Sequence, residues 1–330
     1  MRGRKIIAST ILCILAILFF AAPLFSSVAA QEKPVIAFTL GHGEGDFLLA
    51  ELVDNLTAMG FECKFINDTI DASDLEGVDI LILGSIWGEE NTYSDSEINA
   101  IKAWFEEGKK AIWVAGDSDY GGGNYIIENA NKILEAIGAH IRVEPTSVED
   151  PESNCAAAYR VAANVTNKED KVVAEIVEGV EKPVLFHGPS ILYGLKDGNP
   201  VALEEETIKN VYWVMKTSAA GVINDHDDIM PKAHENGQEG SFVVMAVELY
   251  AGPKSNNKIV VSSAAPYGDY RPMFIDEYKD VLLDGPILVK NTIEWMAKVE
   301  APTPWTLYIV VGVAVIVVVV AVVVVMTKRK

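Results

Sequence analysis

The sequence predicts an α/β fold, and three observations support this class. Short runs rich in β-branched residues alternate with longer amphipathic runs from Pro34 onward. Capping residues stand where helices are expected to begin, and glycines stand where they are expected to end, at Gly60, Gly108 and Gly138. A strand that is repeatedly followed by a helix indicates a parallel sheet with helices on both faces. We therefore expect an open, flavodoxin-like parallel sheet.

The expected elements of the first third follow in simple order. Strands are recognised by runs of β-branched and aromatic residues, and helices by apolar residues three or four positions apart. Asp46 is the expected cap of the first helix, and "SDSE" from Ser94 to Glu97 is a capping box for the second. The predicted elements are strand 35–40, helix 47–59, strands 61–66 and 79–85, helix 94–107, strand 111–117 and helix 124–137.

Residues 139–250 are less regular, and few helical patterns interrupt them. We expect a mostly β insertion there. The α/β pattern then returns with "KIVVSSA" and a closing helix over 285–299. A core that opens and closes with α/β units indicates one domain, 31–299, with an insertion rather than two domains in series. The strands expected in the insertion are 140–144, 156–162, 184–186, 211–217 and 242–249.

The two ends of the chain predict a single-pass membrane protein. Residues 1–30 combine basic residues, an apolar run and a small-residue end, which is the pattern of a signal peptide cut after Ala30. An uncleaved anchor is the alternative, because the apolar run is long. Residues 305–326 carry no charge and are long enough to span a bilayer. Since the basic tail 327–330 stays cytoplasmic, we expect a type I protein in the cell membrane, with an extracellular domain and a proline-containing spacer at 300–304.

The charge of the chain limits its partners. Six of the 27 basic residues lie in the two termini, whereas all 47 acidic residues lie between them, so residues 31–304 carry 21 − 47 = −26. Such a field repels nucleic acid, and no nucleic-acid partner is expected. A cationic ligand, a metal ion or a basic partner fits it better. A merely solvated acidic surface is the plainer alternative.

Cysteines and sequons add two expectations for an exported domain. Cys13 leaves with the signal peptide, so Cys63 and Cys155 form an even pair, which predicts one disulfide. Two buried free thiols are the alternative. Asn-x-Thr sequons predict N-glycosylation, and they stand at Asn55, Asn67 and Asn164.

Three stretches resemble parts of a known family. "YSDSEINAIKAWFEEGKKAIWVAGDSD" resembles the part of class I glutamine-amidotransferase-like domains that leads into the nucleophile position. "KIVVSSAAPYGDY" and "PILVKNTIEWMAK" resemble the closing strand and helix of the non-catalytic branch, whose uncharacterised domains often occur beside ABC transporters. The likeness covers residues 34–138 and 258–298. It implies a non-catalytic domain, with a membrane transporter or surface protein as its partner.

The residues at the nucleophile turn argue against amidotransferase chemistry. Catalytic members carry a GxCxG turn there, whereas this chain reads Gly116-Asp117-Ser118-Asp119-Tyr120. The cysteine and the second glycine are both missing. Ser118 is a weak candidate for a hydrolase nucleophile, with His187 or His226 as its base, but the flanking aspartates disfavour an alkoxide. The simpler alternative is that Asp117 or Ser118 caps the following helix.

The loops that follow the strands supply the candidate site. Loops 41–46, 85–93 and 116–123 should meet at the carboxyl ends of the strands, where ligands bind in open parallel sheets. Oxygen donors there, with a second acidic group at 225–228, suit a divalent cation such as calcium, although solvated loops are the alternative. "GHGEGD" is equally consistent with a plain glycine turn. The expected ligand-binding residues are His42, Glu44, Trp87, Asp117, Ser118 and Asp119.

Together these observations predict a membrane-anchored extracellular binding or scaffold module without catalytic activity, as an accessory to an ABC transporter. A hydrolase that uses Ser118 at the strand-end cleft is the alternative function. The sequence predicts no resident cofactor other than the cation.

Overall fold

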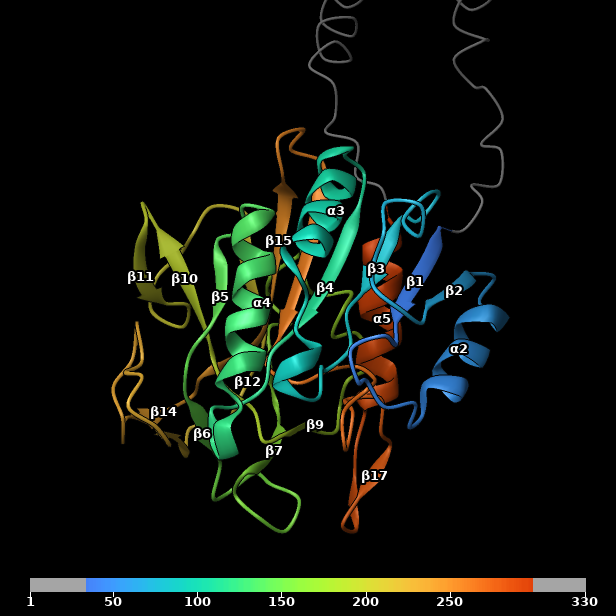
Figure 1. The fold of residues 1–330 in the computed structure, drawn as a ribbon. Coiled ribbons are helices and arrows are strands. Elements are labelled where there is room, and N and C mark those ends of the chain that lie inside the picture. Colours follow the sequence, from blue (N-terminus) through green and yellow to red (C-terminus); the bar gives the residue numbers. More distant parts are fainter. Residues whose placement is uncertain (1–33, 299–330) are drawn as a thin grey trace, which may run out of the picture. The chain divides into compact units, whose positions relative to one another are not determined.

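An eight-stranded sheet runs through residues 34–298, the part of the chain that this computed structural model describes (Figure 1). Its strand order is β2-β1-β3-β4-β16-β15-β12-β8. The first five strands pair in parallel, and β15, β12 and β8 extend the sheet in antiparallel fashion. The strands span β1 Val35–Thr39, β2 Glu62–Ile66, β3 Ile80–Ile82, β4 Ala111–Ala115, β8 Val165–Thr166, β12 Val211–Lys216, β15 Val243–Ala251 and β16 Asn257–Ser262.

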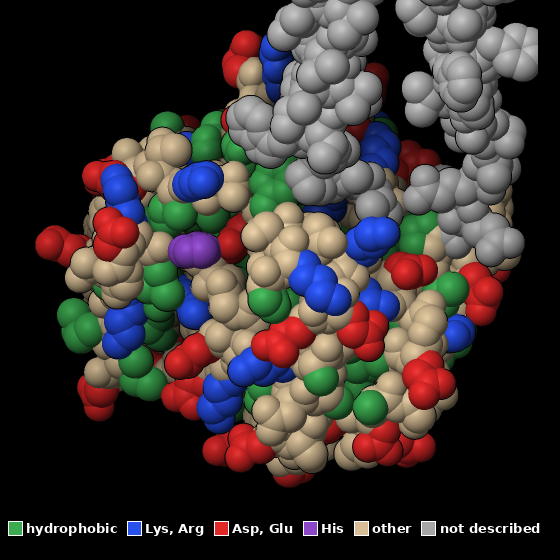
Figure 2. All heavy atoms as spheres, turned by 90° about the horizontal axis from the view of Figure 1, so that it is seen from above, with side chains coloured by type: hydrophobic (Ala, Val, Ile, Leu, Met, Phe, Trp, Pro, Cys, Tyr) green, Lys and Arg blue, Asp and Glu red, His purple; other side chains and the backbone are tan. Residues whose placement is uncertain are grey.

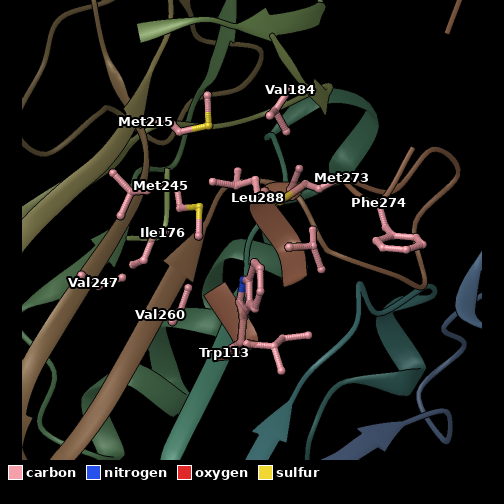
Figure 3. Packing of buried hydrophobic residues seen from close by; sticks show 14 of the residues in the cluster. Trp113, Ile176, Val184, Met215, Met245, Val247, Val260, Met273, Phe274 and Leu288 are labelled. Atoms are coloured by element: carbon pink, nitrogen blue, oxygen red, sulfur yellow. The ribbon is translucent and has the colours of Figure 1, made fainter. Parts of the chain in front are cut away.

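Helices cover both faces of this sheet, as alternation along the strands requires. Trp113 on β4 packs in one layer with Leu52 of α2 and Leu288 of α5, and Figure 3 shows Trp113, Val260 and Leu288 in this layer. Its neighbour Ile112 points to the opposite face and packs in a second layer with α3 and α4. The predicted α/β class and the mostly parallel sheet are therefore confirmed. The helices span α2 Leu49–Ala58, α3 Asp95–Glu106, α4 Asn124–Ala136 and α5 Gly285–Ala297.

The helix caps agree with the sequence at one helix and differ at two. Ser94 caps α3 through the reciprocal capping box with Glu97, as predicted. Asp46 does not cap α2 with its side chain, because the N-cap is Leu48 at φ 62° and Asp46 contributes only its backbone carbonyl. At α4 the N-cap is Gly123, so the expectation that Asp117 or Ser118 caps this helix is wrong.

The segment 139–250 is rich in strands, and two of its longest strands complete the main sheet. β15 pairs with β16, and β12 pairs with β15. The segment is therefore partly an extension of the core sheet. Figure 1 shows β6, β7 and β9 at the lower end of the view, near the carboxyl ends of the parallel strands. The smaller sheets contain β5 Ile141–Val143, β6 Ser147–Glu149, β7 Arg160–Ala163, β9 Val184–His187, β10 Leu192–Lys196, β11 Asn199–Ala202, β13 Gly221–Asn224, β14 Glu239–Gly240, β17 Glu277–Tyr278 and β18 Val281–Leu282.

The predicted disulfide is wrong, because Cys63 and Cys155 are both free thiols. Cys63 is half-buried on β2 and packs against the layer that contains α2. Cys155 is fully buried in a separate small cluster with Leu185 and Leu283. Burial raises the pKa of each thiol. The two side chains belong to different parts of the interior, so the even count did not indicate a pair.

The membrane predictions concern other parts of the chain. Among residues 34–298, every helix is too short or too polar to cross a bilayer. The predicted signal peptide, spacer, membrane helix and basic tail all lie outside the described residues.

Figure 2 shows the face at the amino ends of the parallel strands, where acidic and basic side chains are interspersed. Of the sequon asparagines, Asn67 and Asn164 are exposed and Asn55 is half-buried; their glycosylation stays a prediction.

Candidate functional site

A cleft of about 520 Å³ lies at the carboxyl ends of the parallel strands. Three successive strand ends supply one of its sides. Trp87 follows β3, Asp117 and Ser118 follow β4, and Asp269 and Tyr270 follow β16. Parallel strands end at one edge of the sheet, and the loops that diverge there leave a crevice. The position of the cleft therefore follows from the topology of the core.

The strand-rich segment supplies the opposite wall. β6 contributes Ser147 through Glu149, and the end of β9 contributes His187 and Gly188. Gly188 has φ 60°, and a Cβ atom added there would lie 3.9 Å from the Ser118 Oγ. The backbone after β9 therefore approaches Ser118 closely. The cleft lies between the α/β core and the segment 139–250, and neither part forms it alone.

Aromatic side chains surround this cleft. Tyr120 is 73% exposed and Tyr270 57%, although large aromatic rings are usually more covered than this. Trp87 is held in place because its Nε1 donates to the Gly268 carbonyl over 3.2 Å. Tyr159 lies on the opposite wall. Exposed rings around a concave site offer flat surfaces on which a ligand can stack.

Two carboxyl groups, those of Asp117 and Asp269, line the same cleft. Burial raises the pKa of Asp269 to about 7, although the Tyr270 and Arg271 amides donate to it and oppose this. Burial and then the charge of Asp269 raise the pKa of Asp117 well above its ordinary value. Two acids that share a site in this way do not both ionise at neutral pH. The pair thus offers both a proton donor and an acceptor to a ligand.

His187 faces this pair from the other wall as a neutral base. Burial, together with the charges of Arg160 and Arg271, lowers its pKa to about 4. Its Nε2 atom is buried and has no hydrogen-bond partner. Its ring packs among tyrosines, with the Tyr270 ring centroid 5.4 Å away. An unpaired buried ring nitrogen is costly, so a ligand group that pairs with it would be bound favourably.

Ser118 is buried beside Asp117 and not beside a base. Its amide donates to the Asp117 Oδ1 over 2.6 Å, and its hydroxyl interacts with the same carboxyl group. Within residues 34–298, no hydrogen bond joins the Ser118 hydroxyl to an imidazole. A serine nucleophile needs such a base to accept its proton. The arrangement lacks the central contact of a serine hydrolase.

The remaining expected site residues lie outside the cleft lining. His42 is buried, and its Nε2 lies 2.8 Å from Glu97 Oε1, while Glu44 Oε2 accepts the His42 amide over 2.6 Å. The His42 carbonyl in turn accepts the Trp87 amide over 3.0 Å. His42 and Glu44 therefore support the loop that carries Trp87. Asp119 is also buried and points toward the segment after β13, where its Oδ2 accepts the His226 amide over 2.7 Å.

Sequence reasoning missed Asp269 and Tyr270, which stand in "YGDYRP" directly after the last parallel strand. This loop also lies at the carboxyl end of a parallel strand, β16, so the same reasoning that indicates the other three loops indicates this one. Tyr159 had no comparable signal. Its position depends on how the irregular segment folds back over the core, which no short spacing indicates.

No protein-family model matches this chain, and no curated protein matches it. Among solved structures, the mmIFT52 N-terminal domain is similar, with a TM-score of 0.53, 14% identity, and coverage of 81% of this chain and 99% of that one. A putative GMP synthase subunit from Thermoplasma acidophilum gives a TM-score of 0.40 at 12% identity, covering 81% of this chain and 96% of that one. PurLQS from Thermotoga maritima gives 0.35 at 15% identity, covering 80% and 99%. The first likeness shows a shared α/β fold, and the other two are too distant to carry an argument.

Proposed function

We propose that this chain is a non-catalytic binding module that takes a small polar ligand in the cleft between the core and the segment 139–250. One observation carries the proposal. A preformed cleft of about 520 Å³ joins exposed aromatic rings to an acid pair in which Asp269 is buried and Asp117 half-buried. Its volume falls within the range of small-molecule sites, roughly 300–1,000 Å³. Groups that reduce stability when unpaired are typical of sites that await a ligand.

The polar groups of the cleft favour a neutral or cationic ligand. The two acids do not both ionise at neutral pH, and whichever of them ionises repels an anion and accepts hydrogen bonds from hydroxyl or ammonium groups. Tyr270 and Trp87 offer faces on which a sugar ring stacks or against which a quaternary ammonium group packs. A carboxylate ligand would be repelled by the charge that Asp117 and Asp269 share.

A thermal-shift titration of the full-length protein in detergent tests this proposal. We expect stabilisation by at least one member of a panel of neutral sugars and quaternary ammonium compounds, and none by matched carboxylic acids. The stabilisation should be lost in Trp87→Ala and Tyr270→Ala. Phe65→Ala is a matched control, because Phe65 is 44% exposed, close to the 45% of Trp87, but lies on β2 outside the cleft. Stabilisation by carboxylic acids alone would contradict the proposal.

The second candidate is a hydrolase that uses Ser118. The approach of Gly188 to Ser118 and the low pKa of the adjacent His187 favour it, because a neutral imidazole can accept a proton from a serine hydroxyl. Incubation with p-nitrophenyl esters tests it directly. Turnover that disappears in both Ser118→Ala and His187→Ala would replace the binding proposal with this one.

We further propose that the module has a non-catalytic glutamine-amidotransferase-like fold and is anchored in the cell membrane by residues 305–326. Its described domain would face outward, beside an ABC transporter or another surface protein. The uncharged span, the basic tail and the resemblance of residues 34–138 and 258–298 to that family support this. Carbonate washing of membranes tests the anchor. The full-length chain should stay with the membrane, whereas a variant that ends at residue 304 should be released.

A further inference from the structure

Three carboxylates from two distant segments meet beside the cleft. Oxygen atoms of Asp119, Asp225 and Asp227 all lie within 4.8 Å of one another. Asp119 follows β4, whereas the other two follow β13 and stand on either side of His226. Like charges at this separation repel each other, so the bare cluster works against the fold.

Asp119 provides a second observation. Its side chain is only 1% exposed, and its Oδ1 atom is buried without a hydrogen-bond partner. A buried carboxylate oxygen without a partner is costly, and native proteins rarely leave one unless an ion or water satisfies it.

The other two aspartates are arranged to present oxygen atoms from a short loop. Asp225 Oδ1 accepts the Asp227 amide over 3.2 Å, and Asp227 Oδ1 accepts the Ile229 amide over 2.6 Å. These contacts fix each side chain through one oxygen. The donor set contains only carboxylate oxygens, with neither imidazole nor thiolate, which selects a hard cation.

We propose that Asp119, Asp225 and Asp227 form a calcium site that joins the β4 strand end to the segment after β13. Calcium takes oxygen ligands at about 2.3–2.6 Å, so ligands on opposite sides lie up to about 5 Å apart. Magnesium demands near-ideal octahedral geometry at about 2.0–2.1 Å and usually keeps several of its waters, so a site built from three protein carboxylates favours calcium. Backbone carbonyls or water would supply the remaining ligands.

The site acts on the cleft through His226, which lies between two of the three aspartates. His226 lines the cleft, and its ring packs edge to face on the Tyr120 ring, with 5.2 Å between the centroids. A bound calcium ion would hold this wall against the α/β core. The inference does not rest on the proposed function, because calcium binding is measured without any cleft ligand.

Isothermal titration of chelator-treated full-length protein with CaCl₂ tests the site. We expect one ion per chain with a Kd of about 10⁻⁴–10⁻³ M, the range of extracellular calcium modules. Asp227→Asn should weaken binding at least tenfold. Asp228→Asn is the matched control, because Asp228 is the adjacent exposed aspartate, outside the cluster, and its replacement removes the same charge.

Both variants alter exposed loop positions, so neither should prevent folding. Unchanged binding in Asp228→Asn with loss in Asp227→Asn would support the site. No heat with the wild type, or an equal loss in the two variants, would overturn it, since the second result indicates only diffuse attraction. Magnesium that binds as tightly as calcium would overturn the choice of ion.

Discussion

Two polar clusters in this molecule differ in how their charges are paired. In one, His234 lies between two glutamates, with Nδ1 3.2 Å from Glu144 Oε2 and Nε2 2.8 Å from Glu204 Oε1. In the other, the cleft, the carboxyl groups of Asp117 and Asp269 line the same space, and the charge of Asp269 raises the pKa of Asp117. The first cluster pairs opposite charges, whereas the second gathers like charges and leaves the His187 Nε2 unpaired.

The pKa values record this difference. Burial alone would lower the pKa of His234, but hydrogen bonds to Glu144 and Glu204 and their charges outweigh it and raise the pKa to about 9. Burial raises the pKa of Asp269 to about 7, although the amides of Tyr270 and Arg271 oppose this shift. A cluster that pairs its charges stabilises the fold, whereas one that gathers like charges is what the ligand-binding role proposed for the cleft would require.

The largest effect is expected from His234→Ala. Removing this histidine leaves the buried Glu144 and the half-buried Glu204 without their cation, which should cost about 3–5 kcal/mol of the free energy of unfolding. The folded pKa of about 9 lies above the unfolded value of about 6.5. The stabilisation is therefore complete below pH 6.5 and lost as the pH rises through 9. Urea unfolding at pH 6 and pH 9.5 should show this fall in the wild type and not in the variant.

His140→Ala is the control for this measurement. His140 also contacts a glutamate, Glu248, at 2.7 Å, but its side chain is 53% exposed. Because the His140 partner of this contact is exposed, we expect its removal to cost only about 0–1 kcal/mol. A loss as large as that of His234→Ala would show that burial does not distinguish the two histidines.

Asp269→Asn should stabilise the protein at high pH, whereas His234→Ala should destabilise it. Between about pH 4, the unfolded pKa, and about pH 7, the folded pKa, the folded state keeps a proton that the unfolded state releases. Stability therefore falls as the pH rises through this window, and the uncharged asparagine should not show that fall. We expect the variant to be about 1–2 kcal/mol more stable than the wild type at pH 8 and similar at pH 4. Destabilisation at pH 8 would indicate that the acid pair is structural.

Tyr270→Ala tests whether the Tyr270 ring belongs to the hydrophobic core or to the surface of the cleft. Tyr270 is 57% exposed, so its removal should change the free energy of unfolding by less than about 1 kcal/mol. Chemical unfolding monitored by circular dichroism measures this. A loss of several kcal/mol would mean that the ring belongs to the core and is not part of a binding surface.

The smallest effect concerns the thiols. Because Cys63 and Cys155 are free, dithiothreitol should leave the melting temperature unchanged. Maleimide should modify Cys63 slowly in the folded protein and Cys155 only after unfolding, since Cys155 is fully buried. Mass spectrometry of the labelled peptides separates the two sites. A melting temperature that falls with reductant would restore the disulfide.

The sequence predicted the α/β core well because its signals are local. The capping box at Ser94 and the apolar periodicity of α3 and α4 need only neighbouring residues to be read. The antiparallel extension by β12 and β15 was not predicted, because an apolar run does not reveal its partner strand. Likewise, an even number of cysteines does not show whether Cys63 and Cys155 lie close together. The two residues belong to separate clusters, which depend on how the folded chain packs.

The candidate site, like the fold, was predicted only in part from the sequence. Trp87, Asp117 and Ser118 follow strands, and the structure brings them to one cleft because parallel strands share an edge. His42 instead lies beneath this edge, because Glu97 on α3, 55 residues later, binds its ring. That contact depends on how α3 packs, and nothing in the spacing of "GHGEGD" indicates it.

The pairing of β4 with β16 also governs the order in which the chain can fold. Trp113 stands opposite Val260, and the Lys110 amide donates to the side chain of Asn257, 147 residues later. During synthesis, β1 to β4 emerge long before the strand that shields the open side of β4. Contacts between such distant residues form slowly, and a half-made parallel sheet exposes an edge that can pair wrongly. We expect the nascent chain to be most dependent on chaperones between the emergence of β4 and that of β16, and the cleft to form in the last step.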